Sequence, residues 1–145
     1  MSLTSELSEL QADVTVLYFK AHGYHWNVEG PDFKQYHNFF GEIYGAANED
    51  LDSVAEHIRA LDSYAPGSLK RFMELTNIKD EDTIPAALEM FNRIYQDNQK
   101  IIAAAKAAHA AAEELGQYGI INFLEGLIDS YEKQAWMLRS TIKRI

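Results

Sequence analysis

The chain has 145 residues, a length typical of a single domain that buries a sizeable apolar core. It contains no cysteine, which excludes disulfides and thiolate ligands and leaves only nitrogen and oxygen atoms for any metal site. Its 22 acidic and 13 basic residues give a formal net charge of −9, a sign that attracts cations and disfavours nucleic acid.

The first half of the chain predicts two long helices joined by a tight corner. Apolar or small residues recur at alternating steps of four and three over residues 3–28, which is the period of a helix with one buried face. The stretch VEGPD ends this helix because glycine and proline do not continue it easily. A second helix is expected over residues 33–61, with Asp32 and Gln35 as a capping box at its start.

The second half predicts one short and two long helices. The short helix is SLKRFMEL, and an alanine-rich helix follows, with Asp82 or Thr83 as its N-cap and Gly116 at its end. The last helix covers about residues 118–143, and nothing in the sequence indicates a strand. We therefore expect one all-α domain over residues 1–145, a four-helix bundle with a short extra helix in a long connection between helices two and three.

The five histidines are unevenly spread. His25 lies about one turn before the corner and His37 about one turn after it, so an antiparallel helix pair brings their imidazoles to a similar depth. His22 is a spare histidine three residues before His25. His57 and His109 have no carboxylate context, and we expect both to be structural.

Two carboxylates, Asp52 and Glu56, lie on the same side of the second helix as His37. The fifteen residues from His37 to Asp52 span about 22 Å of helix, whereas a ligand atom lies about 2 Å from its metal. One chain therefore cannot close such a site, but two chains can if their second helices pair antiparallel about a two-fold axis. The crossing is expected near the small residues 45–47.

Other interpretations of these residues remain open on spacing alone. A histidine near a helix end is often a cap or a partly exposed core residue, and Asp52 and Glu56 follow two further acids in what can be a solvated face. A di-iron site within one chain is excluded, because it needs Glu-x-x-His on two helices and no histidine here has Glu three residues before it.

The motif HWNVEGPDFKQYH, the following DSVAEH and the late EKQAWMLRS together resemble the Dps family of mini-ferritins along nearly the whole chain. The resemblance implies a ferritin-like fold and a hollow homo-oligomer, a dodecamer built from two-fold dimers. It also implies iron as the bound metal, oxidation of ferrous iron preferably by hydrogen peroxide, and storage of the ferric mineral. The ligands that it implies are His25 and His37 of one subunit with Asp52 and Glu56 of the partner subunit.

One position departs from the family pattern. The family usually has an acid four residues after the second histidine, where this chain has Gly41. Glu42 is next to it but lies about 100° further round the helix. We therefore expect one firm iron position per site, a weak second one, and a ferroxidase slowed by this loss.

Further roles are implied by the resemblance alone. Trp26 directly follows His25 and is either an aromatic residue near the metal that intercepts radicals or a packing residue of the hairpin. Glu125 and Asp129 match the region whose acids line iron-entry pores in the family, but Asn122 stands where many members have an acid. A solvated acidic face is the alternative for these residues.

Two other functions compete with iron oxidation. Dps proteins also bind DNA, usually through a basic tail, but the first nineteen residues contain no Lys or Arg, and we expect no DNA binding. The other is a shell protein whose metal site has degenerated. The N-terminal MSLTSELSEL lacks the basic and apolar regions of a secretory signal, and no apolar run approaches the ~18 residues of a membrane span, so a cytoplasmic protein is expected.

Overall fold

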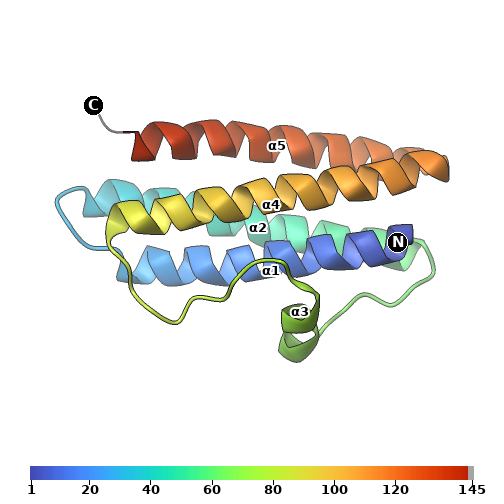
Figure 1. Ribbon diagram of the computed structural model, residues 1–145, viewed down its shortest axis with the longest axis horizontal. Coiled ribbons are helices and arrows are strands. Elements are labelled where there is room, and N and C mark those ends of the chain that lie inside the picture. Colours follow the sequence, from blue (N-terminus) through green and yellow to red (C-terminus); the bar gives the residue numbers. More distant parts are fainter. Residues whose placement is uncertain (144–145) are drawn as a thin grey trace.

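The computed structural model describes residues 1–143, and the last two residues of the expected domain, 144–145, lie outside the described part. Within the described part there are five helices and no strand (Figure 1). In chain order they are α1 (Leu3–Asn27), α2 (Phe33–Ala60), α3 (Leu69–Leu75), α4 (Ala87–Glu114) and α5 (Tyr118–Ile142). The expected all-α fold, with a short helix between the second and third long helices, is confirmed.

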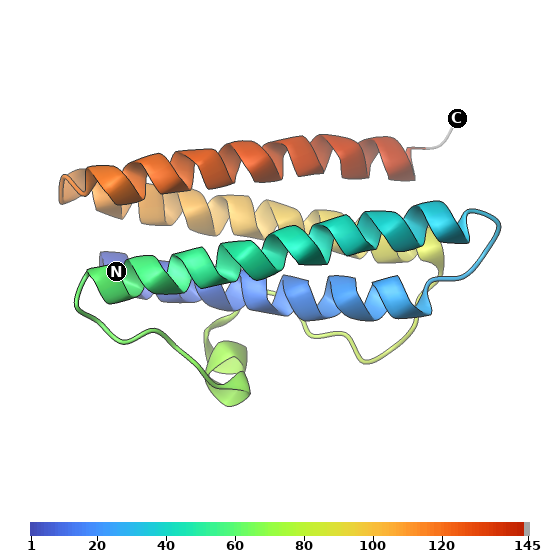
Figure 2. The same ribbon diagram turned by 180° about the vertical axis from the view of Figure 1, so that it is seen from behind.

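The bundle consists of two antiparallel helix pairs. α1 pairs with α2 and α4 pairs with α5, and α1 also packs against α4 (Figures 1 and 2). Residues 61–86, here called the strap, contain α3 and lead from the end of α2 along α1 to the start of α4. Because the strap returns the chain to the other end of the bundle, α2 and α4 run in the same direction, as in ferritin-type bundles.

The core lies where the four long helices meet. Phe40 of α2 and Phe91 of α4 are fully buried, and their rings stack with centroids 4.2 Å apart. α1 is the most enclosed helix, since residues 10–17 are all buried. A helix that contacts only a bundle core keeps one side in solvent. The strap covers that outer side of α1, and polar residues of α1 are therefore also buried.

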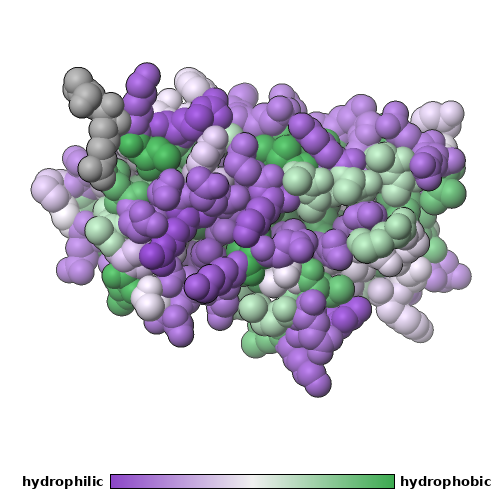
Figure 3. All heavy atoms as spheres, in the orientation of Figure 1, coloured by the Kyte–Doolittle hydropathy of each residue, from purple (hydrophilic) through white to green (hydrophobic). Residues whose placement is uncertain are grey.

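The outer surface of the α4 and α5 face is mostly hydrophilic (Figure 3). This agrees with helices that turn one apolar stripe inward and a polar side to solvent. Of the helices formed by residues 1–143, none has both the length and the apolar character needed to cross a membrane.

The predicted start of α4 is wrong. The helix begins at Ala87 and not directly after Asp82 or Thr83. Thr83 donates its backbone N–H and its hydroxyl to the Glu81 carboxylate, at 3.0 and 2.7 Å, so it does not cap the helix. Pro85 also disfavours helical backbone at the residue before it.

α2 begins where the sequence predicts, with Asp32 as N-cap, but the expected capping box does not form. The Asp32 side chain makes no capping hydrogen bond, and its φ of −101° and ψ of 24° are not the extended conformation that capping residues adopt. The turn before it depends on Gly30, whose φ of +125° is readily adopted only by glycine.

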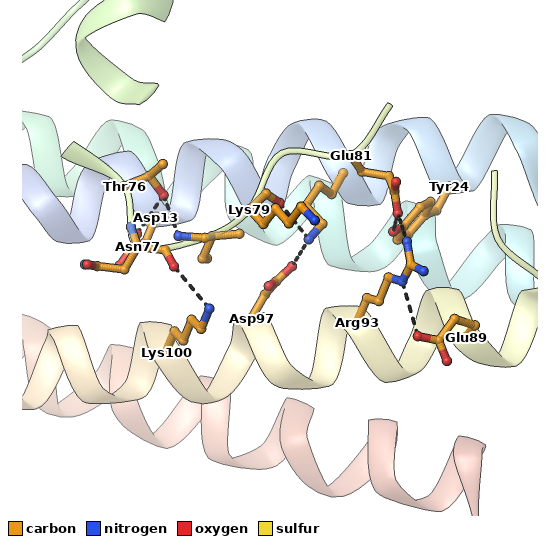
Figure 4. A network of polar contacts seen from close by, with 12 residues as sticks. Asp13, Tyr24, Thr76, Asn77, Lys79, Glu81, Glu89, Arg93, Asp97 and Lys100 are labelled. Atoms are coloured by element: carbon orange, nitrogen blue, oxygen red, sulfur yellow. Dashed lines mark hydrogen bonds and ion pairs between the residues drawn. The ribbon is translucent and has the colours of Figure 1, made fainter. Parts of the chain in front are cut away.

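Buried polar groups fasten the strap to α1 and α4. Lys20 of α1 forms an ion pair of 2.6 Å with Asp97 of α4, with both side chains only 6% exposed. Its ammonium also donates to the Lys79 carbonyl of the strap at 2.9 Å. Asp13 accepts hydrogen bonds from the Thr76 hydroxyl and the Asn77 backbone N–H, at 2.8 and 2.6 Å (Figure 4).

Glu81 is the most connected residue of the strap. Its carboxylate accepts hydrogen bonds from the Tyr24 hydroxyl and from Arg93, each at 2.6 Å, in addition to the two from Thr83 (Figure 4). Burial raises the pKa of Glu81, but the hydrogen bonds from Thr83, Tyr24 and Arg93 outweigh it and lower the pKa to about 2. Glu81 therefore stabilises the fold in its ionised form.

Replacing Glu81 should destabilise the protein in a pH-dependent way. The pKa of Glu81 is about 2 in the folded state, against 4.5 for an unperturbed glutamate, so its contribution is complete above about pH 4.5 and is lost as the pH falls towards 2. We expect Glu81→Gln to lower the free energy of unfolding by about 1–2 kcal/mol at pH 7 and by much less at pH 3, measured by urea unfolding. The control is Glu74→Gln, in an exposed pair with Arg71, which should change little at either pH. An equal loss at both pH values for Glu81→Gln would contradict this account.

Candidate metal centre

The hairpin between α1 and α2 brings His25 and His37 into direct contact. Their rings stack with centroids 3.7 Å apart and planes 17° from parallel. His25 Nδ1 lies 2.6 Å from the His37 carbonyl oxygen, and His37 Nδ1 lies 2.6 Å from the His25 carbonyl oxygen. The two residues therefore hold each other through reciprocal ring-to-backbone hydrogen bonds.

These hydrogen bonds determine which ring nitrogens remain free. A carbonyl oxygen can only accept, so Nδ1 of His25 and of His37 must each carry a hydrogen. In the neutral imidazoles, Nε2 then keeps its lone pair, and both ring orientations are fixed. The His25 carbonyl is in the last turn of α1, where backbone carbonyls lack helical partners, so the His37 ring also completes the helix end. Such an arrangement is typical of histidines that ligate a metal through Nε2.

The two candidate carboxylates are at the other end of α2. Asp52 and Glu56 are both exposed on its surface, about 22 Å and about 28 Å along the helix from His37. Within residues 1–143 of one subunit, no three His, Asp or Glu side chains are placed so that they can hold a metal ion. A single subunit thus presents the histidines and the carboxylates as separate groups.

The small residues midway along α2 are not all on its surface. Gly45 and Ala46 are exposed, but Ala47 is fully buried in the core of its own bundle. The expectation that Ala47 lies at a crossing with a second subunit is therefore wrong, because its side chain points the opposite way. Gly45 and Ala46 are still small, exposed residues midway between His37 and Asp52, and these allow another helix to approach closely.

Gly41 leaves a space beside the histidines. A Cβ atom added at Gly41 would lie 3.4 Å from Cε1 and Nδ1 of His25 and 3.9 Å from Cε2 of Tyr44. These are contact distances rather than clashes, so the position can accept a Cβ atom. The missing acid of the family pattern would extend from a point bordered by these two rings.

Aromatic side chains of both α1 and α2 lie beside the histidine pair. The His22 ring lies 4.0 Å from the Tyr44 ring, nearly parallel to it, and 4.0 Å from the Trp26 ring. The Tyr44 ring also meets His25 edge-on, at 5.2 Å. Burial lowers the pKa of His22, and the neighbouring His25 lowers it further, which favours the neutral form of the ring.

Tyr44 was missed by the sequence analysis, which left the aromatic residues of the second helix without an individual role. The signal was its spacing, since Gly41 and Tyr44 follow His37 by four and seven residues and share its face of the helix. Trp26 is 66% exposed and its recorded ring contact is with His22, so it is not a core residue of the hairpin.

The histidines away from the hairpin differ from each other. His57 packs against Phe123 of α5 with ring centroids 4.5 Å apart, in keeping with a structural role. The expectation that His109 has no carboxylate context is wrong, because its ring nitrogens lie 3.2 Å from Glu113 and 2.9 Å from Glu125. Glu125 and Asp129 are both exposed, and Glu125 pairs with His109 within the subunit.

Known proteins match this chain along nearly its whole length. The family model of the ferritin-like domain matches residues 4–145. The DNA protection during starvation protein of Helicobacter pylori is 31% identical over 92% of this chain and 94% of its own. The crystal structure of Dps from Staphylococcus aureus matches with a TM-score of 0.94 and 29% identity, covering 99% of this chain and 96% of that one.

A further structure, the DPS protein of Vibrio cholerae O1, is described as a member of a broad superfamily of ferritin-like diiron-carboxylate proteins. It matches with a TM-score of 0.92 and 27% identity, over 97% of this chain and 89% of that one. The match extends through the hairpin, the strap and all four long helices, which together make up the described fold. The chain therefore belongs to the ferritin-like family and, within it, to the Dps proteins.

Proposed function

We propose that this protein is an iron-storing mini-ferritin with ferroxidase activity. It binds ferrous iron with His25 and His37 of one subunit and Asp52 and Glu56 of the partner subunit, and oxidises it with hydrogen peroxide. The ferric product is stored inside a hollow homo-oligomer, a dodecamer. The observation that carries the proposal is the histidine pair, whose hydrogen bonds leave both Nε2 atoms free to ligate.

The chemistry of the proposed ligands suits iron. Neutral imidazoles and carboxylates bind Fe(II), and the anionic oxygens stabilise Fe(III) more strongly, so oxidation becomes easier once iron is bound. Peroxide takes up the electrons. The net charge of −9 per chain favours the approach of ferrous ions and the retention of ferric ions within a shell.

The proposal needs two subunits because of the length of α2. Its outward face has the histidine at one end and the carboxylates at the other, about 22 Å apart. Two copies of α2 that pair antiparallel about a two-fold axis put the histidines of each against the carboxylates of the other. Every such dimer then contains two identical sites.

Binding of a metal should depend on the histidine pair. We expect His37→Ala to weaken binding of Co(II), a spectroscopic substitute for Fe(II), by at least about tenfold, followed by its visible absorption. His57→Ala, in a histidine that packs on Phe123 instead, should leave Co(II) affinity unchanged. If the two variants bound Co(II) with equal affinity, the histidine pair would not be part of the metal site.

Shared sites should be rescued by mixing two defective chains. One chain carries His25→Ala and His37→Ala, and the other carries Asp52→Asn and Glu56→Gln. Each alone should not accelerate Fe(II) oxidation by peroxide over buffer, followed by stopped-flow absorbance. A mixed dimer regains one intact site, so random co-assembly should restore about a quarter of the wild-type rate. No recovery in verified mixed oligomers would refute the sharing. A wild-type protein no faster than buffer would indicate the alternative, a shell protein with a degenerate metal site.

Restoring the missing acid should strengthen the second iron position. Isothermal titration under anaerobic conditions should find one tightly bound Fe(II) per site in the wild type and two in Gly41→Asp, since a Cβ atom at residue 41 meets no clash. Gly41→Ala is the matched control, because it adds a Cβ without a ligand. It should keep the wild-type stoichiometry and raise the free energy of unfolding by about 0.5–1 kcal/mol, as expected within a helix. Two tight ions in the wild type would contradict the assignment.

A further inference from the structure

We propose that Met73 is a peroxide-sensitive residue whose oxidation to the sulfoxide unfolds α3 and loosens the strap. The inference requires neither iron nor a second subunit, so it does not rest on the proposed ferroxidase. It assigns a modification site to a helix that contributes no proposed ligand. The oxidant is hydrogen peroxide, and the product can be reduced again.

α3 is weakly held in the fold. It stands out from the side of α1, which is the helix that it packs against (Figures 1 and 2). None of its seven described residues is buried. A helix of this length is not stable in water by itself, so the helical form of α3 depends on its contact with α1.

The contact between α3 and α1 is partly open to solvent. Apolar side chains of both helices line a groove of about 360 Å³ between them, namely Leu69, Phe72 and Met73 of α3 with Val16 and Phe19 of α1. Leu69 and Met73 are four residues apart and therefore share one face of α3. Met73 is 47% exposed, so peroxide dissolved in the surrounding water has access to this side chain.

The other methionines, all of them among the described residues, do not combine exposure with such a contact. Met90 is 1% exposed and belongs to the core. Met137 is 38% exposed, but it lies in the 25-residue α5, where the next residue, Leu138, is fully buried. Met1 precedes the first helix. Oxidation should therefore change the structure most at Met73.

The chemistry is the transfer of one oxygen atom from peroxide to the thioether. The balance is R–S–CH₃ + H₂O₂ → R–S(O)–CH₃ + H₂O. The O–O bond breaks and an S–O bond forms. Sulfur loses two electrons, and the second oxygen of the peroxide leaves as water.

The sulfoxide does not suit the groove. It is polar and accepts hydrogen bonds, and burying such a group against apolar side chains is unfavourable. The buried cation that lines the same groove, Lys20, is already engaged with Asp97 and with the Lys79 carbonyl. The oxidised side chain is therefore expected to turn to water, which removes an apolar contact that holds α3 on α1.

Thr76 connects α3 to the rest of the strap. It ends α3 with a backbone N–H that donates to the Phe72 carbonyl at 2.9 Å. Its hydroxyl donates to Asp13 of α1 at 2.8 Å, and the Asn77 N–H donates to the same carboxylate oxygen. Unfolding of α3 removes the first of these bonds, which weakens the attachment of the strap to Asp13.

The test is hydrogen–deuterium exchange of the full-length protein before and after treatment with hydrogen peroxide, with iron removed by a chelator. Mass spectrometry should find one added oxygen at Met73 and none at Met90. Exchange over residues 69–77 should become about tenfold faster, as expected for a polar group placed in an apolar contact, and exchange in α4 should not change. Methionine sulfoxide reductase with a thiol reductant should restore slow exchange.

Three variants separate Met73 from the other methionines. Met73→Leu keeps an apolar side chain without sulfur, and peroxide should not change its exchange over residues 69–77. Met137→Leu is the matched control at the other partly exposed methionine, and it should respond to peroxide as the wild type does. Met73→Gln puts a polar side chain of similar length in the groove and should exchange fast without peroxide. Circular dichroism and oligomer size show whether each variant is folded.

Several results would overturn the role of Met73. One is a Met73 that stays reduced while Met137 is oxidised, which would mean that its sulfur is shielded. Another is complete oxidation of Met73 with unchanged exchange over residues 69–77. A third is an equal response to peroxide in Met73→Leu, which would place the effect elsewhere. Because these samples contain no iron, none of these results bears on the proposed ferroxidase.

Discussion

The corner between α1 and α2 is closed by two histidine rings that each donate to the other's backbone carbonyl. This exchange joins the end of one helix to the first turns of the next, and it sets the orientation of both imidazoles before any metal arrives. Because Nδ1 of His25 and of His37 is occupied by a carbonyl, chemistry can involve only Nε2. Rigid, preoriented ligands lose little conformational freedom on binding. The hydrogen bonds that close the corner therefore also prepare the two imidazoles for the proposed metal.

A straight helix keeps its two ends apart, and the proposed sharing of the site between two subunits follows from this rigidity. α2 carries nitrogen donors near its start and oxygen donors near its end, and no rotamer closes a gap of about 22 Å. Assembly would therefore be a requirement of the chemistry and not only of storage. In the proposed arrangement an isolated subunit cannot oxidise iron, which would confine the reaction to complete shells and keep ferric ions from forming elsewhere.

The sequence predicted what depends on short-range periodicity and missed what depends on distant partners. Apart from the start of α4, the bounds of the long helices were predicted to within a residue or two, since their apolar stripes are regular and Gly30 and Gly116 follow α1 and α4. Thr83 looked like a helix cap because nothing nearby reveals its bonds to Glu81. Of the two carboxylates beside His109, Glu125 belongs to α5, a different helix from the α4 that carries His109. The contact of Tyr44 with His25 was not predicted, because aromatic residues of a helix bundle usually belong to the core. Asp52 remains a prediction, since its partner would belong to another molecule.

The attachments of the strap also fix the position of His25. It is fastened to α1 at Asp13, Lys20 and Tyr24, three residues spaced by seven and four that form a single stripe along the helix. A slip of one residue would rotate this stripe by about 100° and break all three attachments together, so the strap admits only one register. The same slip would move the end of α1 by ~1.5 Å, whereas metal–ligand distances tolerate only about 0.2 Å. A connecting segment that contributes no proposed ligand thus fixes the position of His25 along the bundle.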